Sequence, residues 1–192
     1  MKKYIPNILT VSRFILIPFI VMSLLHENYI LSIILLSISG LTDILDGLIA
    51  RKCNIISNFG KLIDPLADKA TQVSILVTLV FQNIIPLWIL VVIFVKEMLM
   101  ISGASFLYGK ELVVSSRWYG KLSTIMIYLS MVSSFLINWW NKPLINHPEY
   151  STPMLPNFDI YLYIVAIATT IFSLIMYWKD DFRKKHKIEK EI

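Results

Sequence analysis

Four aspartates in the first half of the chain form two pairs whose spacing suits a helix. Asp43 and Asp46 are three residues apart, and Asp64 and Asp68 are four residues apart. Side chains at these separations project from one face of a helix. If the two segments are neighbouring antiparallel helices, all four carboxylates converge on one place.

Converging carboxylates need a counter-charge, because like charges repel and each group would otherwise take up a proton. Two divalent cations would cancel the four negative charges. An all-oxygen donor set with no cysteine or histidine nearby favours Mg²⁺ or Mn²⁺ over zinc. Metals held in this way most often bind phosphate oxygens. The sequence therefore predicts a site for two such ions, with the ligands Asp43, Asp46, Asp64 and Asp68.

The residues between the two acidic pairs also suit a phosphate ligand. Gly47 removes a side chain beside Asp46, where backbone and ligand could approach closely. Arg51 offers a planar fork that matches a pair of pyrophosphate oxygens. The alternative is that the glycines serve close helix packing and that the aspartates mark solvated helix ends.

The elements that must position these residues are apolar and long. The chain is 56% apolar and 16% charged, whereas a soluble domain is about a quarter charged. Six apolar segments are each close to the ~20 residues that cross a membrane as a helix. They cover residues 6–25, 29–50, 62–82, 86–107, 120–139 and 158–178. We predict an all-α, polytopic membrane protein with six transmembrane helices, formed by one domain over residues 1–192.

Lysine and arginine are distributed unequally between the loops, which predicts the orientation. Lys142 is alone on one side. Fourteen residues lie on the other: Lys2, Lys3, Arg51, Lys52, Lys61, Lys110, Arg117, Lys121, Lys179, Arg183, Lys184, Lys185, Lys187 and Lys190. Such a bias places both termini in the cytoplasm and the loop over 138–157 outside the cell membrane. The net charge of +5 then reflects an anionic membrane surface, and no nucleic-acid partner is expected.

The acidic segment is similar to a known signature. Asp43-x2-Asp46-Gly47-x2-Ala50-Arg51-x8-Gly60-x3-Asp64-x3-Asp68 resembles that of the CDP-alcohol phosphatidyltransferases at every fixed position. IPNILTVSRFILIPF (residues 5–19) looks like the amino-terminal segment of that family, and RWYGKLST (residues 117–124) is similar to the start of its fifth helix.

The resemblance implies six helices, a homodimer, and a polar cavity that opens to the cytoplasm. By this likeness Asp43 and Asp64 would bridge both metals, Asp46 would bind the first, and Asp68 would bind the second and act as general base. Gly47, Arg51 and Ser57 would contact the CDP-diacylglycerol headgroup, and the cytidine pocket would lie near Asn7 and Thr10.

The resemblance also implies the reaction, in which a phosphatidyl group passes from CDP-diacylglycerol to a small alcohol and CMP leaves. The likeness is greatest to the bacterial phosphatidylglycerophosphate synthase branch, which makes glycerol 3-phosphate the expected acceptor. Arg117 and Lys121, four residues apart, are candidates for binding its phosphate, although both also suit membrane anchoring. That branch often has Arg-Glu in its fourth helix, where this chain has Lys96-Glu97. Lys96 is a second candidate, or it forms a buried ion pair.

Two alternatives stay open at this point. The same chemistry with phosphatidylglycerol as acceptor would make a cardiolipin synthase. A different class, an ion or proton transporter, would also place aspartates inside the membrane. Against the transporter, the aspartates gather near one membrane face, and no pair of broken helices is visible.

Overall fold

The computed structural model describes residues 5–53, 58–108, 118–146 and 153–191. Within these ranges the side chains of 5–11, 45–53, 58–65, 100–108, 144–146, 177–178 and 180–191 fall outside the description. The described residues form six helices and no strand, which confirms the all-α prediction. The helices are α1 (Ile5–Leu25), α2 (Tyr29–Cys53), α3 (Asn58–Phe81), α4 (Leu87–Tyr108), α5 (Trp118–Asn146) and α6 (Asp159–Glu191).

Three helix ends differ by four or more residues from the pattern of apolar residues, among them that of α6, which continues to Glu191 beyond the predicted end at residue 178. The third apolar segment was predicted to begin at residue 62, but α3 begins at Asn58, so Asp64 and Asp68 lie well inside the helix. The fifth was predicted to end at residue 139, with an outer loop following, but α5 continues through Pro143 to Asn146. The apolar pattern missed these turns because a helix can continue through polar residues once it leaves the lipid.

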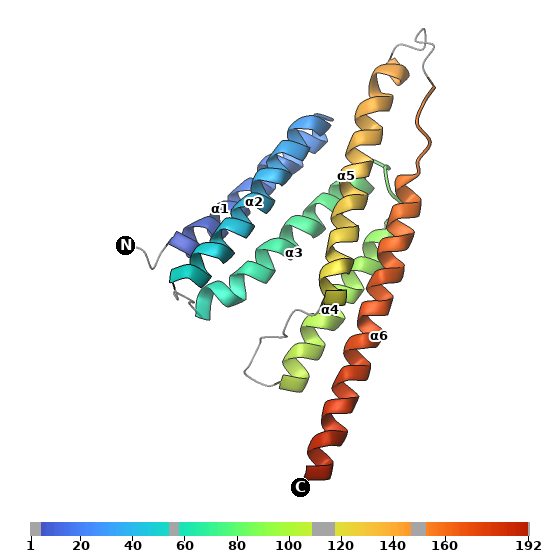
Figure 1. Cartoon of the computed structure of the whole chain (residues 1–192). Coiled ribbons are helices and arrows are strands. Elements are labelled where there is room, and N and C mark those ends of the chain that lie inside the picture. The colour runs from blue at the N-terminus through green and yellow to red at the C-terminus, as the bar shows by residue number, and fades with distance from the viewer. Residues whose placement is uncertain (1–4, 54–57, 109–117, 147–152, 192) are drawn as a thin grey trace.

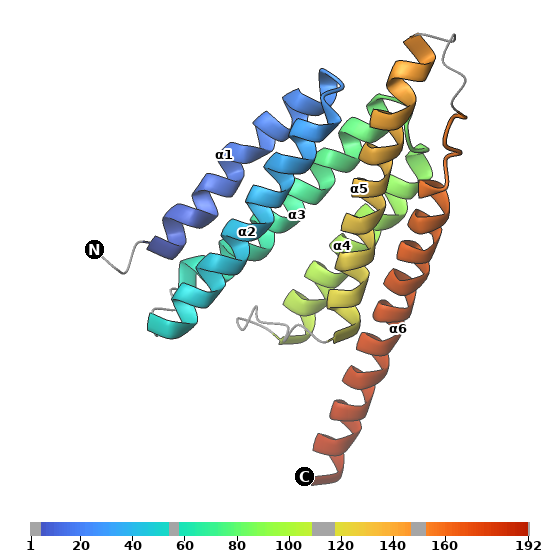
Figure 2. The same ribbon diagram turned by 45° about the horizontal axis from the view of Figure 1, so that its top comes forward.

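The helices are arranged in two groups that run lengthwise beside each other. Helices α1, α2 and α3 lie together on one side, and α4, α5 and α6 lie together on the other (Figures 1 and 2). Helix α5 packs against α2 and α3 and connects the groups. The buried core therefore takes aliphatic side chains from both groups, among them Leu24, Leu79, Ile93, Met131 and Ala166.

Small hydroxyl side chains fasten neighbouring helices inside each group. Ser23 on α1 and Ser32 on α2 are hydrogen-bonded at 2.7 Å, and Ser123 on α5 and Thr170 on α6 at 2.6 Å. Small residues let helix backbones approach closely, and hydrogen bonds between them are stable in an apolar setting. Both contacts are typical of helices that pack within a membrane.

The outer surface of the bundle is strongly apolar. Each of the six described helices has large apolar side chains that are more than a third exposed, such as Phe19, Phe81, Trp88 and Ile175. Among the described residues, two helical stretches are long and apolar enough to cross a membrane, Trp118–Pro143 and Asp159–Met176. Shorter apolar stretches lie at Ser12–Leu25 and Tyr29–Ile44. The exposed surface is compatible with lipid as the surrounding solvent.

Candidate active site

A cavity of about 750 Å³ lies between the two helix groups. Four helices contribute to its wall: Arg13 from α1, Leu36, Ser39, Gly40, Asp43 and Ile44 from α2, Asp68 and Thr71 from α3, and Gly120, Lys121, Thr124, Ile125 and Tyr128 from α5. The wall combines aliphatic side chains with a few charged and hydroxyl groups. That composition suits a ligand with an apolar part and an ionic part.

Two of the four predicted metal ligands face this cavity together. Asp43 comes from α2 and Asp68 from α3, so the antiparallel pairing of these segments brings one carboxylate from each predicted pair to the same space. The Asp43 side chain is about half exposed. Two carboxylates at one cavity wall are suitable oxygen donors for a hard divalent cation.

Asp43 has a buried cationic partner that the sequence pattern did not reveal. The guanidinium of Arg13 on α1 forms an ion pair with Asp43, and the Arg13 side chain is 3% exposed. An arginine buried at this depth needs a carboxylate or another acceptor. The signal available in the sequence was a lone arginine inside the first apolar segment, which on its own does not identify its partner.

Asp68 has a second unforeseen partner. The hydroxyl of Tyr128 on α5 donates a hydrogen bond of 2.9 Å to Asp68 Oδ1. The same side chain lines the cavity, seven residues after Lys121 on α5. Nothing near Tyr128 in the sequence distinguishes it from the other tyrosines, of which the chain has nine in all. Only the fold could reveal this contact.

Lys121, a predicted acceptor-binding residue, is exposed and lies in the cavity wall. Its position on α5 places it in the wall of the same cavity as Asp43 and Asp68. A cation beside a space that can hold phosphate is consistent with the predicted role. Arg117, its predicted partner, is outside the described residues.

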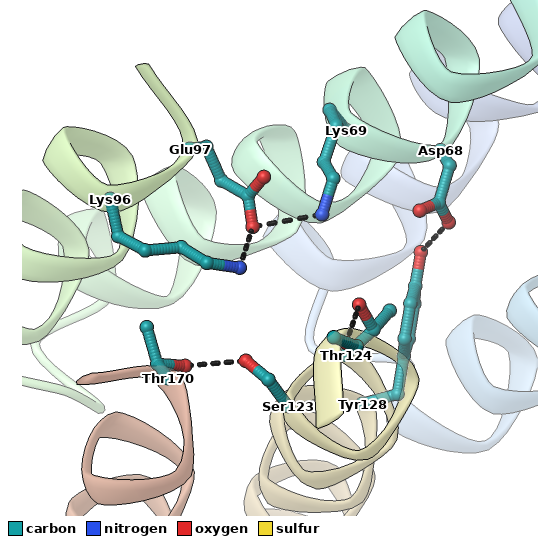
Figure 3. A network of polar contacts seen from close by, with 9 residues as sticks. Asp68, Lys69, Lys96, Glu97, Ser123, Thr124, Tyr128 and Thr170 are labelled. Atoms are coloured by element: carbon teal, nitrogen blue, oxygen red, sulfur yellow. Dashed lines mark hydrogen bonds and ion pairs between the residues drawn. The ribbon is translucent and has the colours of Figure 1, made fainter. Parts of the chain in front are cut away.

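Lys96 belongs to a separate buried ion network. Lys96 on α4 and Lys69 on α3 each lie 2.8 Å from Glu97 Oε1. Figure 3 shows that Lys69 points toward α4 while its neighbour Asp68 points toward Tyr128. Of the two roles weighed for Lys96, the structure confirms the buried ion pair.

Most other predicted site residues have described backbones and undescribed side chains. Asn7 and Thr10 lie in α1, Asp46, Gly47 and Arg51 in α2, and Asp64 in α3. Asp46 follows Asp43 by three residues on one continuous helix, and Asp64 precedes Asp68 by four on another. Ser57 is outside the described residues. Their roles stay predictions.

Known proteins that are similar in sequence to this chain indicate which class of reaction the cavity could serve. The family model for CDP-alcohol phosphatidyltransferase matches residues 3–178. The chain is 33% identical, over 92% of its length and 99% of the relative's, to the CDP-diacylglycerol–glycerol-3-phosphate 3-phosphatidyltransferase of Aquifex aeolicus. It is 32% identical to the enzyme of the same name from Haemophilus influenzae, over 92% of both chains. A probable cardiolipin synthase (CMP-forming) of Drosophila melanogaster is 36% identical over 53% of this chain and 32% of its own.

Proposed function

This chain belongs to the CDP-alcohol phosphatidyltransferase family and is therefore an enzyme, and from that premise we propose that it transfers the phosphatidyl group of CDP-diacylglycerol to glycerol 3-phosphate. The observation that carries the proposal is the meeting of Asp43, Asp68 and Lys121 in one cavity. Relatives named for this reaction align with nearly the whole chain. Membership of the family also decides between the enzyme and the transporter in favour of the enzyme.

Members of this family use divalent metal ions, and the described residues fit such ions. Asp43 and Asp68 supply carboxylate oxygens from two helices to one space, and Asp46 and Asp64 lie three and four residues from them on the same helices. We propose that these four aspartates hold two ions of Mg²⁺ or Mn²⁺. When bound, the ions would neutralise charge on the pyrophosphate and acidify the attacking hydroxyl.

Side chains of this chain carry out proton transfer and acceptor binding. Asp68 accepts the proton of the glycerol 3-phosphate hydroxyl, whose oxygen attacks the lipid-side phosphorus. The bond from that phosphorus to the bridging oxygen breaks, and CMP leaves with the electron pair. Lys121, together with Arg117, binds the acceptor phosphate and holds the hydroxyl in reach.

The CDP-diacylglycerol headgroup is bound by residues nearer the cytoplasmic helix ends. In this proposal Gly47, Arg51 and Ser57 contact the pyrophosphate, and Asn7 and Thr10 line the cytidine pocket. The apolar cavity wall, which includes Leu36, Ile44 and Ile125, suits the lipid part of the substrate.

The proposal includes the setting of the enzyme. All six helices cross the cell membrane, both termini and the cavity mouth face the cytoplasm, and two chains form a homodimer. The apolar exterior of every described helix supports the membrane setting. The distribution of lysine and arginine supports the orientation.

Phosphatidylglycerol is the rival acceptor, and the comparisons favour it less. The probable cardiolipin synthase aligns with about half of this chain, whereas the two glycerol-3-phosphate enzymes align with 92% of it.

The decisive experiment measures CMP release by the purified protein in detergent with CDP-diacylglycerol and Mg²⁺ or Mn²⁺. Glycerol 3-phosphate should give turnover, and phosphatidylglycerol should give little. Turnover with phosphatidylglycerol alone would reassign the acceptor, and no CMP with any alcohol would refute the proposal.

Asp43→Asn and Asp68→Asn should each reduce this turnover at least ~1,000-fold, because each removes a charged ligand from the reacting site. Glu27→Gln is the matched control, since it neutralises a carboxylate that pairs with Lys142 outside the cavity. It should keep wild-type turnover. Equal activity of Asp68→Asn and wild type would contradict the assigned base.

A further inference from the structure

Tyr128 is the residue whose contact the proposed reaction leaves unexplained. Its ring is largely buried in the wall of the cavity, and its hydroxyl reaches 2.9 Å to Asp68 Oδ1. The two residues are separated by 60 positions in the chain, so the contact exists only because α5 packs against α3. A buried phenol hydroxyl requires a polar partner, and here the partner is the candidate base itself.

We propose that Tyr128 is a positioning residue that fixes the orientation of the Asp68 carboxylate; this role rests on the proposed function of Asp68. A carboxylate on a short side chain can rotate about its last torsion, which is broad and has weak preferences. A hydrogen bond at Oδ1 restricts that rotation, so Oδ2 is presented in one direction. Partners of this kind orient metal-binding and catalytic carboxylates in many enzymes.

The neutrality of the phenol matters as much as its position. A cation bonded to Asp68 would compete with a metal ion for the carboxylate oxygens. Lys69 is adjacent in sequence, yet its ammonium group is 2.8 Å from Glu97 Oε1, on the side toward α4 (Figure 3). Tyr128 thus orients Asp68 without adding charge, while Glu97 holds the neighbouring cation elsewhere.

The position of Tyr128 on α5 also connects the base to the acceptor. Lys121, Thr124 and Tyr128 occupy successive turns of α5, and all three line the cavity. One rigid helix therefore carries both the cation proposed to bind the acceptor phosphate and the hydroxyl that orients the base. Helix α5 then contributes both to the position of the acceptor phosphate and to the orientation of the base on α3, which favours a reactive geometry.

The first test is Tyr128→Phe, which removes the hydroxyl and keeps the ring. We expect kcat to fall ~10–100-fold, as for other lost partners of this kind, with KM for CDP-diacylglycerol changed less than ~3-fold. Tyr163→Phe is the control: Tyr163 is fully buried, its oxygen lies 3.4 Å from Ser134 Oγ, and it does not line the cavity. Its kcat should stay at the wild-type value. A Tyr128→Phe enzyme with wild-type kcat and only a lower Tm would overturn the proposal.

The second test measures Mn²⁺ binding by electron paramagnetic resonance, without substrates, on wild type, Tyr128→Phe, Asp68→Asn and the double variant. Tyr128→Phe and Asp68→Asn should each weaken binding, and the double variant should bind no more weakly than Asp68→Asn alone. Independent, additive losses would show that Tyr128 does not act through Asp68. This cycle needs no turnover, so it stays decisive even if wild type proves inactive with glycerol 3-phosphate.

Discussion

At the scale of single residues, a substitution of Lys121 tests acceptor binding separately from the other steps of the reaction. Lys121→Gln removes the charge and keeps a polar side chain at the cavity wall. We expect KM for glycerol 3-phosphate to rise roughly tenfold, because a hydrogen bond to a charged group contributes about 1.5–3 kcal/mol. KM for CDP-diacylglycerol should stay close to wild type in steady-state kinetics.

Lys142→Gln is the control for that variant. It makes the same chemical change on the same helix, at a residue whose ammonium group pairs with Glu27 at 3.1 Å. Both constants should be unchanged. A rise in KM for the acceptor that is equal in the two variants would indicate a general effect of surface charge and would remove Lys121 from the site.

The acidic residues of the site were predictable and their partners were not. Asp43 and Asp68 could be read from the sequence because carboxylates in apolar segments at helical spacing are rare and costly without a counter-charge. Nothing in the sequence singles out Arg13 or Tyr128, because one is an arginine in an apolar run and the other is one tyrosine among several. Their roles depend on which helices pack together, which local spacing does not encode.

At the scale of helices, the ion network between α3 and α4 carries the next prediction. Glu97 neutralises two ammonium groups, those of Lys69 and Lys96, and its side chain is 6% exposed. Glu97→Gln leaves both cations without their partner and should destabilise the protein by roughly 3–5 kcal/mol. Lys96→Met should cost less, because Glu97 keeps Lys69. Unfolding by denaturant in detergent measures both.

The exposed pair of Glu27 and Lys142 supplies the comparison. Both side chains are more than a third exposed, and breaking such a pair costs about 0–1 kcal/mol. Glu27→Gln should therefore unfold near the wild-type midpoint. If Glu97→Gln also unfolds there, the buried network does not stabilise the packing of α3 on α4.

Five of the six apolar segments gave helix starts within about two residues, while the ends near polar sequence were less certain. Apolar periodicity marks where lipid requires a helix. It gives no signal where a helix continues through polar sequence, as α5 does to Asn146 and α6 does to Glu191. Asn141 illustrates the missing information: its amide bonds both the N–H and the carbonyl of Leu155, at 2.9 Å each, and so holds the returning segment against the helix.

At the scale of the whole molecule, three of the 18 lysines and arginines lie well inside the apolar segments: Arg13, Lys69 and Lys96. The structure pairs each of these three, Arg13 with Asp43 and both Lys69 and Lys96 with Glu97. Each of these three cations thus has a carboxylate partner, whereas the orientation of the helices is predicted from the remaining lysines and arginines.

Thiol labelling of cells tests that orientation. Cys53, the single cysteine, lies at the end of α2 and should react with a membrane-impermeant maleimide only after the membrane is opened. In Cys53→Ser/Met154→Cys the new thiol, at a position 55% exposed, should react in intact cells. Labelling of the detergent-solubilised proteins, in which no membrane separates the reagent from either thiol, is the positive control. The reverse pattern would contradict cytoplasmic termini.

The division of the cavity between two helix groups has a consequence for how the enzyme is made. A nascent chain that has inserted only α1, α2 and α3 already has the complete acidic motif. It lacks α5, and with it Tyr128, which is proposed to orient Asp68, and Lys121, which is proposed to bind the acceptor. Such a half-synthesised protein has the proposed metal ligands without the α5 wall of the cavity, so we expect full turnover only after α5 has joined the bundle.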